Sequence, residues 1–255
     1  MTSVISLETT KRLLKDIKQL IKTPLDDNGI YYKHDDTNML RGYALIIGPK
    51  DTPYFGGYYF FIFDYPTDYP YSPPKVKYMT NDGIVRYNPN LYKCGKVCVS
   101  ILNTWTGDKW SSCQTITSVL LTLCSLLNDA PLLNEPGYQK IHVDFKPYQE
   151  IIEYKNIDFA VCQIIKNVPK DFEFFYPIMK EAFIKNYVSL CEIVASKNKE
   201  VKILRTNIYY LSITIDYNAL EHKLLNIKQY MDTNIDTNTD TNIDTNIDTN
   251  TDIVK

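Results

Sequence analysis

A cysteine and an asparagine eight residues apart are the residues of this sequence best suited to covalent chemistry. Asn90 ends the turn Asn88-Pro89-Asn90, and Cys98 follows it after a single glycine, Gly95. Proline restricts its own φ and favours an extended preceding residue, so the turn is stiff, whereas glycine permits a bend that a side chain would block. The spacing predicts a short amide held near a thiol. An accessible, partly ionised thiol is a nucleophile, and a neighbouring amide can donate to an oxyanion as it forms.

This segment resembles the active-site segment of ubiquitin-conjugating enzymes. The family signature is His-Pro-Asn, with eight residues from that asparagine to the catalytic cysteine and a glycine three residues before the cysteine; Asn90, Gly95 and Cys98 keep this spacing. Two other stretches resemble the family in the same order, a strand–turn segment over 48–57 and a proline-rich loop over 65–75. The resemblance covers the chain from about residue 7 to residue 137.

The resemblance implies a role for three residues. Cys98 is expected to take the C-terminal carboxyl group of ubiquitin from the thioester of the activating enzyme, and Asn90 to support the loop and stabilise the oxyanion. Glu135, just before Pro136, is expected to assist the attacking lysine, although a shift of one residue would give this place to Asn134. A lysine amine is protonated at neutral pH, so a nearby carboxylate can orient it and help remove its proton.

The same resemblance implies partners and two departures from the family pattern. Ubiquitin, the activating enzyme, ubiquitin ligases and protein substrates are the expected partners, and ATP is consumed by the activating enzyme, so no metal or bound cofactor is expected. Asn88 stands where the signature has histidine, and asparagine can also form local hydrogen bonds. In the two ligase-facing loops Tyr71 keeps an aromatic residue, whereas Ser112 replaces the usual proline.

The hydrophobic pattern predicts the elements that must hold these residues. Residues 7–22 have an apolar stripe at helical spacing, and residues 115–127 are apolar nearly all round, which indicates a central helix. Short links join four segments rich in β-branched and aromatic residues, which favours an antiparallel sheet. These segments are 30–33, 39–47, 58–64 and 75–79. The prediction is an α+β, UBC-like fold: a four-stranded antiparallel meander with an N-terminal helix and a central helix after the active site.

Side chains around these elements carry further expectations. The basic side of the first helix is a solvated face or, as in the family, a docking surface for the activating enzyme and ligases. Its residues are Lys11, Arg12, Lys15, Lys18 and Lys22. Of the two tryptophans, Trp110 matches the one that the family packs beneath the active site better than Trp105 does.

Three regions are predicted along the chain: a ubiquitin-conjugating core over 5–137, a mainly helical extension over 138–230 and a disordered tail over 231–255. The extension resembles that of large conjugating enzymes, some of which also act as ligases. Helical spacing occurs over 148–154, 159–166 and 178–194, with further helices expected at the C-terminal end of the fold, and 201–216 is β-like without an assigned place. The tail repeats Asp-Thr-Asn and is too polar to fold alone.

Composition excludes several classes of protein. Six irregularly spaced cysteines in 255 residues fit reduced thiols in a cytoplasmic or nuclear protein. The sequence has no apolar run of membrane-spanning length, so no membrane partner is expected. A net charge of −2 does not indicate a nucleic-acid-binding protein.

Other functions have less support in the sequence than catalysis at Cys98. A zinc site from Cys94 and Cys98 lacks a second closely spaced ligand pair, and the three histidines lie in no hydrolase-like context. Cys98 as a merely buried thiol, a non-catalytic ubiquitin-binding scaffold on the same fold, and a conjugating enzyme for another ubiquitin-like modifier remain as alternatives. Non-catalytic relatives lack the cysteine, so its presence together with Asn90 favours catalysis.

Overall fold

A computed structural model describes residues 5–239 and contains the predicted four-stranded sheet. Its strands lie in the order β1-β2-β3-β4 and each pairs antiparallel with the next, which confirms the meander and the α+β fold. The strands are β1 Ile30–His34, β2 Arg41–Ile47, β3 Tyr58–Asp64 and β4 Lys75–Tyr78. In the register of β2 and β3, Leu45 lies opposite Phe60 and Tyr43 opposite Ile62, so these four side chains share one face.

Helix α1, Leu7–Lys22, begins after Ser6, whose hydroxyl accepts a hydrogen bond from the Thr9 N–H at 2.9 Å. Its apolar stripe is narrower than predicted, because Leu13 and Leu20 are buried whereas Leu7, Leu14 and Ile21 are exposed.

Arg12 does not belong to the solvated basic side of α1, and that expectation was wrong for this residue. Its Nε donates to the buried Asp16 carboxylate at 2.9 Å, and its Nη1 donates to the Ser112 carbonyl at 2.7 Å. Arg12 therefore connects α1 to the loop that precedes the central helix.

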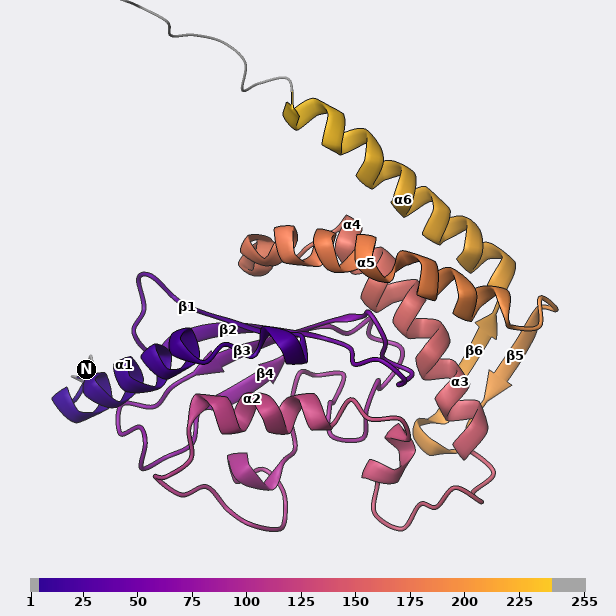
Figure 1. The fold of residues 1–255 in the computed structure, drawn as a ribbon. Coiled ribbons are helices and arrows are strands. Elements are labelled where there is room, and N and C mark those ends of the chain that lie inside the picture. Colours follow the sequence, from indigo (N-terminus) through magenta and orange to yellow (C-terminus); the bar gives the residue numbers. More distant parts are fainter. Residues whose placement is uncertain (1–4, 240–255) are drawn as a thin grey trace, which may run out of the picture.

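The central helix α2, Ile116–Ser125, is capped by Thr115 and Ser118, whose side chains each bond the other's backbone N–H. One side of α2 is fully buried, and Figure 1 shows α2 beneath the sheet, where it covers one face. Its buried residues are Ile116, Val119, Leu120 and Leu123. Burial raises the pKa of the Cys124 thiol at the end of this helix, so Cys124 packs as an apolar residue.

The C-terminal extension is mainly helical and ends with a hairpin and a long helix. Its elements are α3 Phe145–Lys155, a π-helical segment Asn156–Gln163, α4 Ile164–Lys166, a 3₁₀ segment Lys170–Phe175, α5 Tyr176–Ala195, β5 Lys202–Arg205, a 3₁₀ turn Ile208–Tyr210, β6 Ser212–Ile215 and α6 Tyr217–Thr239. The helices predicted in this region are confirmed. The β-like stretch forms the β5–β6 hairpin.

Helix α6 corrects the start of the predicted tail. It runs to Thr239, so residues 231–239 are helical, and the tail begins later than position 231. The helix continues because Leu220, Leu224, Ile227 and Met231 form one buried stripe. Residues 240–255, the rest of the predicted tail, lie outside the described residues. Within 5–239, no helix is both long and apolar enough to cross a membrane.

The extension packs on the face of the sheet opposite α2, as Figure 1 shows for α5. Phe172 stacks on Phe60 with ring centroids 4.4 Å apart and meets Tyr43 edge-on at 5.7 Å. The Tyr58 hydroxyl donates to the Met179 carbonyl in α5 at 2.8 Å. Both faces of the sheet are therefore buried around β3, and the extension shares one core with the preceding domain.

Replacing Phe172 by alanine is expected to lower the free energy of unfolding of the whole protein by about 3–5 kcal/mol, because it removes a fully buried ring and leaves a cavity. Phe174→Ala is the matched control, since this ring is 38% exposed and its loss should be clearly smaller. Denaturant unfolding followed by circular dichroism measures both. An unchanged unfolding free energy for Phe172→Ala would show that the contact of Phe172 with Phe60 and Tyr43 does not stabilise the protein.

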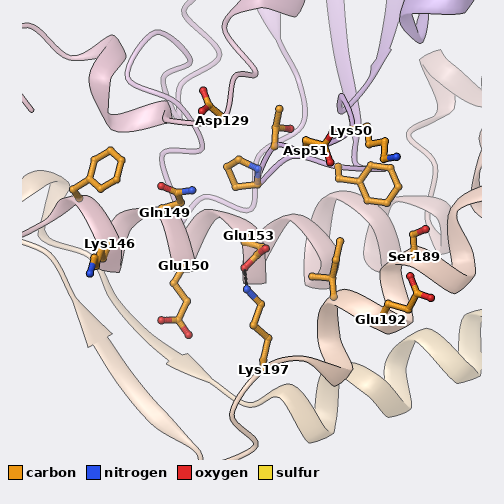
Figure 2. Close-up of a pocket in the computed structure, with 15 residues that line it drawn as sticks. Lys50, Asp51, Asp129, Lys146, Gln149, Glu150, Glu153, Ser189, Glu192 and Lys197 are labelled. Atoms are coloured by element: carbon orange, nitrogen blue, oxygen red, sulfur yellow. Dashed lines mark hydrogen bonds and ion pairs between the residues drawn. The ribbon is translucent and has the colours of Figure 1, made fainter. Parts of the chain in front are cut away.

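A cleft of about 1040 Å³ lies between the loop at 50–55 and helices α3 and α5 (Figure 2). Lys197 reaches Glu153 in an ion pair, and the other charged side chains are of both signs. Cys98, Asn90 and Glu135 do not line this cleft. Its lining therefore contains none of the residues predicted to carry the chemistry.

Candidate active site

The predicted active-site loop lies between β4 and α2, and Asn88 is fully buried at its centre. The Asn88 side-chain nitrogen donates to the Tyr54 hydroxyl at 2.9 Å and to the Leu126 carbonyl at 2.7 Å. Its side-chain oxygen accepts from the Asn90 N–H at 2.9 Å. Asn88 therefore connects the loop to α2 and to the segment before β3, which is a structural role that an amide can fill in place of an imidazole.

The structure brings Asn90 and Cys98 together through two hydrogen bonds. The Cys98 N–H donates to the Asn90 carbonyl at 2.9 Å, and the Asn90 side-chain amide donates to the Cys98 carbonyl at 2.6 Å. A primary amide has two N–H groups, so one more donor is present on the same nitrogen. The amide is thus held beside the backbone of the cysteine, in a position that supports the loop.

Cys98 is only 2% exposed, which corrects the expectation of an accessible thiol. Its neighbours Val97, Val99 and Leu102 are also buried, so the cysteine lies in an apolar part of the loop. The Cys98 side chain is therefore nearly closed off from solvent in this structure.

Gly95 and Pro89 shape the loop from either side of Asn90. Gly95 has a φ of +89°, and a Cβ at this position would lie 2.9 Å from the Tyr78 carbonyl oxygen, so only glycine fits without a shift of β4. Pro89 is buried, and its carbonyl accepts a hydrogen bond from the Arg86 guanidinium. Both residues therefore lie where a stiff, closely packed turn requires them.

Glu135 is held by a residue of the extension. It follows a 3₁₀ segment, Pro131–Asn134, and its carboxylate accepts a hydrogen bond from the Tyr209 hydroxyl at 2.5 Å. The preceding Asn134 donates to the Leu126 carbonyl at 3.1 Å and to the Asn88 side-chain oxygen at 3.4 Å. Glu135 is thus the next residue along the chain after Asn134, which contacts Asn88. Among the residues that the structure describes, Glu135 has no hydrogen bond to Asn90 or Cys98.

Two residues near this site were missed in the sequence, namely Tyr209 and Arg86. The Arg86 Cζ lies over the Tyr92 ring at 3.6 Å and over the Tyr209 ring at 4.4 Å from the centroids. The sequence around Tyr209 offers one hint of a special position, the two adjacent tyrosines in the β-like stretch 201–216. Nothing local connects that stretch with residue 135.

Tyr71 and Ser112, the two predicted ligase-facing residues, both contact α1. The 63% exposed Tyr71 donates its hydroxyl to Glu8 at 2.6 Å, and the Ser112 carbonyl accepts from Arg12. Glu8 and Arg12 are four residues apart and share one side of the helix. The two loops and the start of α1 therefore form one surface.

Trp110 is the buried tryptophan and donates its Nε1–H to the Pro70 carbonyl at 2.7 Å, whereas Trp105 is 42% exposed. This placement agrees with the choice of Trp110 as the packed residue. All six cysteines are free, and within 5–239 no group of three or more histidine, cysteine, aspartate or glutamate side chains is arranged to hold a metal ion.

The sequence of this chain is similar to those of known proteins. The family model described as ubiquitin-conjugating enzyme matches residues 12–156. Ubiquitin-conjugating enzyme E2 Z of Homo sapiens is 43% identical over 179 residues, which are 69% of this chain and 50% of the human protein. E2 Z of Xenopus tropicalis is 42% identical over 179 residues, 69% of this chain and 56% of that protein. The human dual E2 ubiquitin-conjugating enzyme/E3 ubiquitin-protein ligase BIRC6 is 36% identical over 181 residues, 66% of this chain and 4% of that protein. The chain thus spans about half the length of the E2 Z proteins it matches.

Proposed function

Because this chain belongs to the ubiquitin-conjugating enzyme family, we propose that it accepts ubiquitin as a thioester on Cys98 and transfers it to lysine side chains of protein substrates. The observation that carries the proposal is the pair of hydrogen bonds between Asn90 and Cys98, which joins the two residues of the family signature. The family match covers the segment that contains both.

Loading is an exchange between two thioesters. The Cys98 thiolate attacks the carbonyl carbon of the thioester on the activating enzyme, and the thiolate of that enzyme leaves. ATP is consumed upstream, so this step needs no nucleotide, metal or cofactor on the present chain. Because Cys98 is 2% exposed, its sulfur has to become more accessible, by a change of rotamer or a movement of the loop, before it reaches the incoming carbonyl.

Transfer is the attack of a lysine amine on the Cys98 thioester. The amine nitrogen bonds to the carbonyl carbon, a tetrahedral oxyanion forms, and the Cys98 thiolate leaves as the isopeptide bond is completed. The Asn90 amide is the candidate donor to the oxyanion, and the Glu135 carboxylate is the candidate group that orients the amine and accepts its proton.

Partners of the activating-enzyme and ligase classes fit the surface formed by Glu8 and Arg12 of α1 with the loops of Tyr71 and Ser112. The exposed Tyr71 ring and the exposed Ser112 loop offer a side for a ligase to contact. The hydrogen bond from Arg12 to the Ser112 carbonyl fixes the Ser112 loop relative to α1. A partner that binds this surface can therefore contact the helix and the loop together.

The test is a charging assay with activating enzyme, ATP and ubiquitin, analysed on gels with and without reductant. We expect an adduct that forms only with ATP and disappears with reductant, and peptide mass spectrometry should place the modification on Cys98. If an adduct forms with another ubiquitin-like protein and none forms with ubiquitin, that protein, and not ubiquitin, is the modifier that Cys98 accepts. If no modifier forms an adduct, the non-catalytic scaffold becomes the better explanation.

A further inference from the structure

The turn of the β5–β6 hairpin in the extension contacts both the active-site loop and the segment that carries Glu135. The Tyr209 hydroxyl donates to the Glu135 carboxylate at 2.5 Å, and the Tyr209 ring lies 4.4 Å from the Arg86 Cζ. Arg86 in turn lies over the Tyr92 ring and donates to the Pro89 carbonyl. One tyrosine therefore contacts the predicted amine-assisting carboxylate and, through Arg86, the residue next to Asn90.

The turn that presents Tyr209 is firmly held. The buried Asp144 carboxylate accepts from the Ile208 N–H at 2.9 Å and from the Asn207 N–H at 3.1 Å. The Thr206 hydroxyl donates to the Ile208 carbonyl at 2.7 Å. These bonds fix the backbone on the N-terminal side of the tyrosine.

The turn is also strained. Tyr209 and Tyr210 both have positive φ values, 57° and 51°, a conformation that is unfavourable for a residue with a Cβ. Such strain persists only where the surroundings hold it, and it is common at functional sites. Here it directs Tyr209 towards Glu135, whereas Tyr210 is 92% exposed.

We propose that Tyr209 is a positioning residue for the transfer step: it holds the Glu135 carboxylate in the orientation that receives the attacking lysine amine. This proposal rests on the proposed conjugating activity. Within residues 5–239, Tyr209 is the hydrogen-bond partner of the Glu135 carboxylate, and a glutamate side chain without such a partner has several rotamers. A carboxylate has sites for further hydrogen bonds, so the amine can bind while Tyr209 stays in place.

The chemistry of the phenol suits a permanent donor. Burial and the hydrogen bond to Glu135 raise the pKa of Tyr209 above its usual value, so the hydroxyl keeps its proton throughout the neutral range. The ring is packed edge-on against Tyr148 at 5.9 Å, and this contact limits its movement. Tyr209 thus orients the carboxylate without exchanging a proton itself.

The test uses Tyr209→Phe in the full chain, which removes the hydroxyl and keeps the ring against Arg86 and Tyr148. The protein is first loaded with ubiquitin, the activating enzyme is then stopped, and the transfer to free lysine is timed. We expect loading within about twofold of the native protein and transfer about tenfold slower, because a displaced carboxylate assists the amine less well. Tyr210→Phe is the matched control and should transfer at the native rate. Only loaded protein is scored, so an unfolded fraction does not enter the rate.

A double variant separates positioning from a general structural effect. If Tyr209 acts through Glu135, then Glu135→Gln with Tyr209→Phe should transfer no more slowly than Glu135→Gln alone, because the carboxylate to be oriented is already gone. The positioning role would be overturned if the double variant transferred more slowly than Glu135→Gln by the same factor that Tyr209→Phe alone causes. It would also be overturned if Tyr209→Phe transferred at the native rate. A native protein that does not load would instead count against the proposed function, so the two failures are distinguishable.

Discussion

A Cys98→Ala protein is expected to form no thioester with the modifier, a loss of more than about 10³-fold in loading. In the proposed reaction the Cys98 sulfur is the atom that bonds to the carbonyl carbon, and the alanine side chain has no nucleophilic atom to take its place. Removing one small, nearly buried side chain should leave the fold intact, since the backbone of residue 98 keeps its hydrogen bond to the Asn90 carbonyl. A charging gel without reductant measures the loss.

The control variants for this prediction are Cys94→Ala and Cys113→Ala. Both cysteines are exposed, so they are easier to reach than Cys98, and an adventitious adduct would be expected on them first. Each variant should load as the native protein does. If Cys98→Ala still loads and Cys94→Ala does not, the catalytic assignment belongs to Cys94.

A Cys98→Ser protein adds information about the bond itself. A serine hydroxyl ionises far less readily than a thiol, so loading should be slow. Any adduct that accumulates should be an ester and should therefore resist the reductant that cleaves the native thioester.

The sheet and its helices were predictable because their signals are local. Alternating and aromatic-rich segments separated by turn residues specify the strands of a meander, and each strand pairs with the next one along the chain. What could not be predicted is which side chains reach across elements. The spacing of Arg12 predicts a place on the basic side of α1, yet its guanidinium donates to a carbonyl 100 residues away in sequence.

The burial of Cys98 was less predictable from the sequence than the interval between Asn90 and Cys98. The interval from Asn90 to Cys98 is a local feature, and the structure joins these residues by hydrogen bonds. The burial of Cys98 depends on apolar packing around the loop, which the interval alone does not determine.

The partner of Glu135 was missed for a related reason. Tyr209 lies 74 residues after Glu135, in a turn whose positive φ values are carried by tyrosines without the glycine or asparagine that usually marks such a conformation. Only the docking of the extension brings the two side chains together.

An Asn90→Ala protein is expected to load at close to the native rate and to transfer the modifier to lysine about 10²–10³-fold more slowly. A thiolate is a strong nucleophile and depends less on a donor to the oxyanion than a neutral amine does. The loop itself should persist, because two of its bonds use only the backbone of residue 90: its N–H donates to Asn88, and its carbonyl accepts from Cys98. The substitution therefore removes the side-chain donor and little else.

Single-turnover measurements on the Asn90→Ala protein separate the two steps. Loading is timed with activating enzyme and ATP, and transfer is timed after the loaded protein has been isolated from both. Asn90→Asp is a useful second variant, because it keeps the size and shape of the side chain but replaces the N–H donors by a carboxylate, which repels an oxyanion and the Cys98 carbonyl that the amide now contacts. Slow transfer in both variants with near-native loading supports the oxyanion role. An equal loss of loading and transfer in Asn90→Ala would refute it, because the amide would then act only by holding the loop that carries Cys98.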